Sequence, residues 1–161
     1  MFSVLISDGV AIPLGIIFGL AAGLGIALGV LLIDLTNSSI TIFTLLSCTS
    51  LMVLSFSANM YFRIIHSNTP TRIQFGNTGF LWDIGKVILI TSVLGAGVFA
   101  WLGEIFNLFP YYSKFPTIFT RYFVGSVIIS PLILYGSIRS GFTTKWNQPL
   151  DNPITEDLSK Q

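Results

Sequence analysis

Charged residues are scarce in this chain. Lys, Arg, Asp and Glu make up 9% of its 161 residues, whereas hydrophobic residues make up 52%. Soluble domains carry roughly 25% charged residues, so this chain has too little polar surface to cover a water-soluble globule of its size. The mean hydropathy is +0.79. The composition therefore predicts an integral membrane protein whose main solvent is lipid.

Basic clusters, cysteine pairs and histidine clusters are also lacking. The net charge is +1 and the eight basic residues are dispersed, which excludes nucleic-acid binding. Cys48 and His66 are the single residues of their types, so no internal disulfide and no zinc site can be built. No G-x-S-x-G nucleophile pattern is present either. We therefore predict no catalytic residues, no metal site and no enzymatic activity.

Long stretches without charge take up most of the chain. They run from Asp8 to Asp34, from Asp34 to Arg63, from Lys86 to Glu104 and from Arg121 to Arg139. The last two gaps hold 17 residues each. As helices they would extend about 26 Å, close to the roughly 30 Å hydrocarbon core of a bilayer. This spacing predicts an all-α bundle of four transmembrane helices, at about residues 10–33, 40–65, 79–109 and 117–138.

Short connections and a polar tail complete the predicted organisation. Residues 1–139 are expected to form one transmembrane domain and residues 140–161 a polar C-terminal tail. The polar segment 66–78 is the longest connection, and the aromatic PYYSKFP segment at 110–116 is predicted to be a short loop between two prolines. The amino terminus has no basic start before its apolar run, so we expect the first span to be retained.

Basic residues are distributed unevenly between the ends of the predicted spans. With four crossings, six bases fall on the side of the two termini: Arg63, Arg72, Lys86, Arg139, Lys145 and Lys160. Lys114 and Arg121 fall on the other side. Cytoplasmic loops are enriched in Lys and Arg. The sequence therefore predicts a multi-pass protein with both termini in the cytoplasm or its topological equivalent.

Glycines recur at helical spacing in the first predicted span. Gly15, Gly19 and Gly23 are four residues apart and share one side, whereas Gly25 and Gly29 lie on another. Small residues let membrane helices approach closely. Either both faces pack inside the monomer, or one face docks another subunit. A third alternative is a flat surface for a pigment, quinone or sterol ring.

A few polar residues in and beside the spans are candidates for function. Glu104 and Arg121 each end a 17-residue apolar gap, so they are predicted to pair at the outer boundary, either as a packing device or as a ligand clamp. Serines in the second span can bond to their own helix carbonyls or line a polar conduit. No charge falls at a predicted span centre, which argues against an ion-coupled transporter. Three further residues could contact a bound pigment or ligand: Asn59, His66 and Asn107.

Two segments carry a resemblance. RYFVGSVIISPLILYG at 121–136 and IPLGIIFGLAAGLGIALGVLLID at 12–34 resemble the vitamin-binding subunits of energy-coupling-factor transporters and the membrane-integrated input domains of bacterial sensors. The shared pattern is a glycine-rich early helix and a late G-x-x-x-x-x-P-L-x-L, here Gly125 to Leu134. Where the sensor domains carry an acid after that glycine, this chain has Ser126, and both families have more than four helices. The resemblance implies binding of a small solute.

Three functions follow from these features. The first is a non-catalytic accessory or structural subunit of a larger membrane complex, which docks through its small-residue helix faces. The second is a small-solute binding or transport subunit or a sensor input domain, as the resemblance implies. The third is a membrane-embedded enzyme. The expected partners are membrane lipid and other integral membrane subunits, and a bound lipid or pigment is left open as a cofactor.

Overall fold

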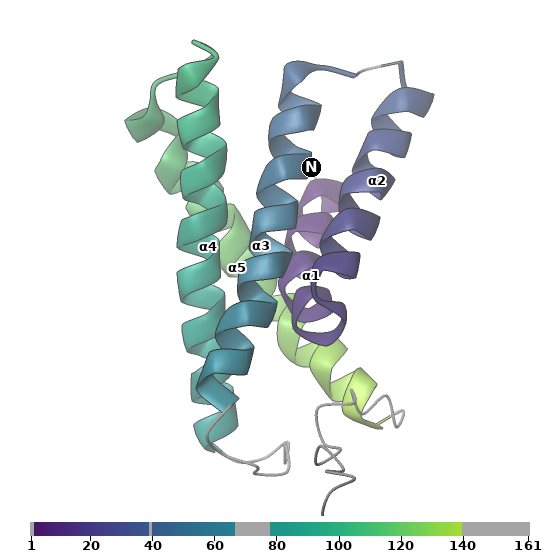
Figure 1. The fold of residues 1–161 in the computed structure, drawn as a ribbon, viewed down its shortest axis with the longest axis vertical. Coiled ribbons are helices and arrows are strands. Elements are labelled where there is room, and N and C mark those ends of the chain that lie inside the picture. Colours follow the sequence, from purple (N-terminus) through teal and green to yellow (C-terminus); the bar gives the residue numbers. More distant parts are fainter. Residues whose placement is uncertain (1, 39, 67–77, 140–161) are drawn as a thin grey trace, which may run out of the picture.

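The computed structural model describes residues 2–38, 40–66 and 78–139, and within these ranges the protein is all-helical. Five helices follow one another: α1 (Phe2–Phe18), α2 (Leu20–Thr36), α3 (Ile42–His66), α4 (Thr78–Ile105) and α5 (Tyr111–Arg139). Figure 1 shows α3 and α4 upright beside each other with α5 behind them, and α2 at the edge next to α3. Most of the predicted 66–78 connection and the 140–161 tail lie outside the described residues.

Three helices are long and apolar enough to cross a membrane. They cover Ile42–Ile65, Gly79–Ile105 and Tyr111–Ser137. The spans predicted at 40–65 and 79–109 correspond to α3 and α4, although α4 ends four residues early because Phe106–Phe109 turn out of the helix. Three of the four predicted spans therefore have a counterpart of spanning length, which is compatible with an integral membrane protein.

The first predicted span is not one continuous helix but is broken at Gly19. Gly19 has φ 63° and ψ −134°, a conformation that residues with a side chain rarely adopt. Asn59 of α3 stabilises the break, because its Nδ2 donates to the carbonyls of Gly15 at 3.1 Å and Ile16 at 3.3 Å. Both carbonyls lie in the last turn of α1, where a helix lacks some of its usual donors. The Gly15 carbonyl also accepts from the backbone N–H of Gly19 at 2.8 Å. The prediction of one helix over 10–33 is therefore wrong.

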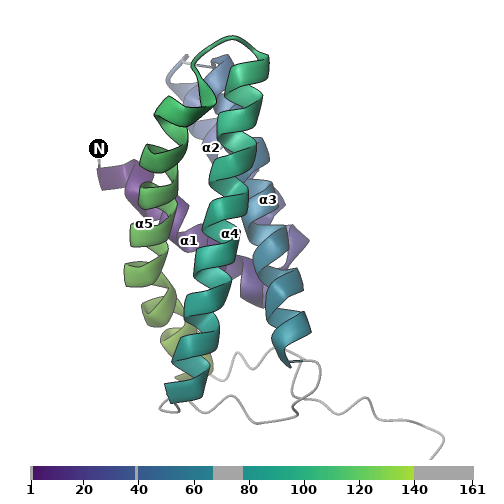
Figure 2. The same ribbon diagram turned by 90° about the vertical axis from the view of Figure 1, so that its left-hand side faces the viewer.

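The break redirects the start of the chain. Figure 2 shows α1 inclined across the bundle, whereas α2 runs back along α3. α1 packs against both α3 and α5, and glycines permit each contact. A Cβ on Gly15 would lie 2.5 Å from the Ser55 carbonyl oxygen, and one on Gly9 would lie 2.6 Å from the Gly125 carbonyl oxygen. The helix backbones are therefore in direct contact at both positions.

The aromatic segment at 110–116 is helical from Tyr111 onward, so the predicted loop there is wrong. Pro110 precedes the helix, and its carbonyl accepts from the Ser113 amide at 3.1 Å. Aromatic rings four residues apart then stack along α5: Tyr111–Phe115 at 5.3 Å, Phe115–Phe119 at 6.2 Å and Phe119–Phe123 at 5.6 Å between centroids. Such pairs stabilise a helix. α5 therefore begins six residues before the expected start of the fourth span.

Candidate functional site

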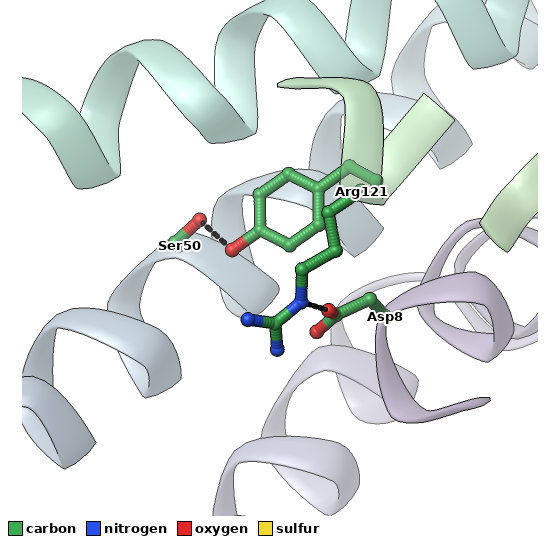
Figure 3. A network of polar contacts seen from close by, with 4 residues as sticks. Asp8, Ser50 and Arg121 are labelled. Atoms are coloured by element: carbon green, nitrogen blue, oxygen red, sulfur yellow. Dashed lines mark hydrogen bonds and ion pairs between the residues drawn. The ribbon is translucent and has the colours of Figure 1, made fainter. Parts of the chain in front are cut away.

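An ion pair joins α1 to α5 inside the bundle. Arg121 donates through Nε to the Oδ2 atom of Asp8 (Figure 3). The Asp8 side chain is 5% exposed and that of Arg121 is 40% exposed. Charged groups within membrane spans pair with one another and usually mark functional positions. This pair is the main candidate for a functional site.

The partner of Arg121 differs from the expected one. Among the described residues, no ion pair joins Arg121 to Glu104, which is exposed. The early start of α5 explains the difference. Arg121 lies ten residues into α5, about 15 Å from its start, whereas Glu104 lies one residue before the end of α4. The two side chains therefore emerge at different depths, and Arg121 meets an acid of α1 instead.

The same geometry places a charge well inside a span. The sequence predicted that Arg121 sits at the outer boundary, but α5 runs from Tyr111 to Arg139 and Arg121 stands four residues before its middle. Asp8 is brought to this depth because α1 crosses the bundle at an incline and touches α5 at Gly9 and Gly125. The argument against transport from the absence of interior charges therefore no longer holds.

A second polar contact links α3, α4 and α5 beside the ion pair. Tyr122, 3% exposed, lies with its hydroxyl 2.8 Å from Ser50 Oγ, and Ser50 Oγ donates to the Gly95 carbonyl at 2.8 Å. A serine hydroxyl has one hydrogen, so Tyr122 is the donor to Ser50. Figure 3 shows this contact next to Arg121. Sequence reasoning missed both Asp8 and Tyr122. The signals available in the sequence were an acid just before the first predicted span, Asp8, and a tyrosine directly after Arg121.

Three serines add unpaired hydroxyls to the same interior. Ser92 of α4 and Ser126 and Ser130 of α5 are each 0% exposed. None of their hydroxyls has a hydrogen-bond partner within the described part of the chain. Ser55, by contrast, donates to the Ala11 carbonyl at 3.1 Å and ties α3 to α1. The interior thus contains one serine, Ser55, that joins two helices by a hydrogen bond, and three serines whose hydroxyls have no partner among the described residues.

The residues predicted to contact a pigment or ligand are not brought together. Asn59 is engaged with the carbonyls of α1. Asn107 lies exposed beyond α4 with φ 53°. Its backbone N–H donates to the Glu104 carbonyl at 2.9 Å, which is the geometry of a helix C-terminus. His66 is the last residue of α3, and its side chain is outside the described residues. Asn59 and Asn107 therefore stabilise helix ends.

The glycines of the first predicted span divide into two groups. A Cβ on Gly15 or Gly23 would meet α3, at 2.5 Å from the Ser55 carbonyl oxygen and 3.2 Å from the Met52 Cα. No heavy atom of the described residues lies within 4 Å of such a Cβ on Gly25 or Gly29 of α2. Gly15 of α1 and Gly23 of α2 therefore both pack against α3, each from its own helix, whereas Gly25 and Gly29 touch no other described segment.

Comparison with protein-family models, curated proteins and solved structures found no match for this chain. A functional assignment therefore depends on the contacts within the helix bundle. The ion pair Asp8–Arg121, the Tyr122–Ser50 contact and the three unpaired serines are the polar groups available for it.

Proposed function

We propose that the protein is a non-catalytic membrane component that binds a small polar solute inside its helix bundle, as the binding unit of a transporter or sensor. The observation that carries this proposal is the ion pair Asp8–Arg121 inside the span. Charges in lipid are costly, and apolar residues of similar volume often stabilise a fold as well as a buried ion pair does. Keeping both charges here favours a role in binding.

The ion pair has capacity for further hydrogen bonds. An arginine side chain has five N–H donors. Among the described residues, the bond from Nε to Asp8 is the one hydrogen bond of the Arg121 side chain. The terminal nitrogens of Arg121 can therefore donate to oxygen atoms of a solute. Because the pair is neutral as a whole, a neutral or zwitterionic solute meets it without leaving an uncompensated charge in the bundle. This is the class of solute that we propose.

The outer face of α2 favours a second candidate function, a subunit of a larger membrane complex. Gly25 and Gly29 face open space, and large leucines beside them are strongly exposed: Leu24 at 44%, Leu28 at 60% and Leu32 at 57%. Glycines beside exposed leucines on a helix surface let a second membrane helix approach closely. We propose another integral membrane subunit as the partner on this face, with lipid covering it when the subunit is absent.

Native mass spectrometry of the gently extracted protein separates the two functions. A solute-binding unit should carry a non-covalent small-molecule mass that is lost in the Arg121→Met variant. A complex subunit should carry a protein partner at fixed stoichiometry that is lost in a Gly25→Leu, Gly29→Leu double variant. Gly85→Leu is the matched control, because Gly85 of α4 also has nothing within 4 Å of its Cβ position. A bare protein under every condition would contradict both functions.

We also propose that the ends of α3 and α5 at His66 and Arg139 face the cytoplasm. Figure 1 shows these two ends at the same end of the bundle, and most bases of the chain fall near them. The expected result is that a cysteine replacing Ser67 labels from the cytoplasmic side and one replacing Ser113 from the opposite side. Cys48 is first changed to alanine. Labelling of both positions from one side would contradict this orientation.

A further inference from the structure

We propose that Ser92, Ser126 and Ser130 line a hydrated site between α4 and α5, which accepts a small neutral molecule bearing hydroxyl groups. This inference rests on the proposed solute-binding function and gives it a location. It is distinct from the ion pair, because none of the three serines contacts Asp8 or Arg121 among the described interactions. The argument has three steps: where the serines lie, why they need a partner and which partner suits them.

The serines are placed together by the register of α4 against α5. A Cβ on Gly95 would lie 3.4 Å from Cε2 of Tyr122, which marks one point of contact between the helices. Ser92 comes three residues before Gly95, and Ser126 four residues after Tyr122. Because α4 and α5 are antiparallel, both steps run the same way along the bundle, by about 4.5 Å and 6 Å, and each keeps to one helix side. Ser130 follows one turn further along α5.

The hydroxyls of these serines require partners that the described residues do not supply. A buried hydroxyl without a hydrogen bond costs about 1–3 kcal/mol. Serine and threonine in helices commonly avoid this cost by donating to a carbonyl of the preceding turn. Thr91, next to Ser92, does so to the Val87 carbonyl at 2.7 Å, and Thr120 does so to the Pro116 carbonyl at 2.8 Å. The three serines do not, although they are 0% exposed.

The lack of charged residues near the serines favours a neutral bound molecule. α4 has no charged residue between Lys86 and Glu104, and α5 has none between Arg121 and Arg139. An ion held at the serines would therefore have no counter-charge on either helix. Water or a small polyol matches the mixture of donors and acceptors without this penalty. Glycerol is a suitable probe, because each of its hydroxyls can both donate and accept.

Cysteine accessibility tests the site. In a Cys48→Ala background, Ser92, Ser126 and Ser130 are replaced singly by cysteine and treated with methyl methanethiosulfonate, a small neutral reagent. The thiolate attacks its sulfenyl sulfur, which forms a mixed disulfide and releases methanesulfinate. Ala58→Cys on α3 is the matched control, because Ala58 is also 0% exposed but packs in the apolar core. Thiolate forms only where water reaches the sulfur, so we expect the serine positions to react on the order of ten times faster than the control. Glycerol should slow their reaction.

The outcomes separate this inference from the proposed function. Serine positions no more reactive than Ala58→Cys would overturn the hydrated site, whereas loss of a bound solute in Arg121→Met would still support solute binding. Reactive serine positions that glycerol does not slow would overturn the assignment to a hydroxylated molecule. Reactive positions slowed by glycerol support the site, even if no solute mass depends on Arg121. The three cysteine variants are tested separately, so the failure of one variant to fold leaves two measurements of the site.

Discussion

Replacing Gly15 with leucine is expected to destabilise the helix bundle by about 3 kcal/mol, the upper end of the typical range for overpacked interiors. The reason is that an added Cβ would lie 2.5 Å from the carbonyl oxygen and 2.7 Å from the Cα of Ser55. These are backbone atoms of α3, so no side chain can rotate away, and α1 must separate from α3. The measurement is the thermal midpoint of the purified protein in mild detergent.

Gly85→Leu is the matched control for this prediction. Gly85 lies within α4, and no heavy atom of the described residues lies within 4 Å of a Cβ added there. Leucine also favours a helix by several tenths of a kcal/mol over glycine. The thermal midpoint of Gly85→Leu should therefore stay unchanged or rise slightly. Equal destabilisation by both variants would show that α1 does not pack against α3 as described.

Removing one charge of the Asp8–Arg121 ion pair is expected to cause the other large loss of stability. Arg121→Met leaves the Asp8 carboxylate, 5% exposed, without its partner, and removing one member of a buried ion pair costs about 3–5 kcal/mol. Asp8→Leu should cost less, because the Arg121 side chain is 40% exposed and can extend toward the polar boundary. Thermal midpoints in detergent give the order of the two variants.

The double variant Asp8→Leu, Arg121→Met is the control for the pair. It removes both charges and places apolar side chains between α1 and α5, so it should recover most of the stability lost in Arg121→Met. Losses that simply add in the double variant would mean that the two residues do not interact. A double variant that is stable yet binds no solute would assign the pair to binding rather than to folding.

The sequence predicted the helices whose signal is continuous. α3 and α4 are long apolar segments bounded by Arg63, Lys86 and Glu104, and their placement follows from hydropathy and bilayer thickness alone. The orientation assigned from the bases stays a prediction. Docking by Gly25 and Gly29 also stays a prediction, whereas Gly15 and Gly23 lie against α3 within the monomer.

The break at Gly19 could not be predicted from the local sequence. Glycine contributes the same hydropathy to an apolar run whether its φ is negative or positive, and the surrounding residues favour a continuous helix. The deciding contact comes from Asn59, forty residues later, whose Nδ2 donates to the carbonyls of Gly15 and Ile16 next to the break. A helix interruption that depends on a tertiary hydrogen bond has no signal in its own segment.

The candidate site was misplaced for a related reason. Pro110 and Pro116 were interpreted as the two ends of a loop, but proline is tolerated near the start of a helix, and the stacked aromatic rings continue α5 through Pro116. That change of start moves Arg121 from the boundary into the span. Asp8 could then be its partner only because α1 is inclined, a consequence of the glycine contacts with α3 and α5.

Solute-dependent stability is the measurement that tests the proposed function most directly. Thermal midpoints of the wild type and of the Asp8→Leu, Arg121→Met variant are compared in a panel of polyols, neutral amides, zwitterionic amino acids, anions and cations. A ligand present at one hundred times its Kd stabilises the native state by about 2.7 kcal/mol. A neutral or zwitterionic solute is expected to raise the midpoint of the wild type and not that of the variant. A panel in which no solute shifts the midpoint of the wild type more than that of the variant would contradict solute binding at the ion pair.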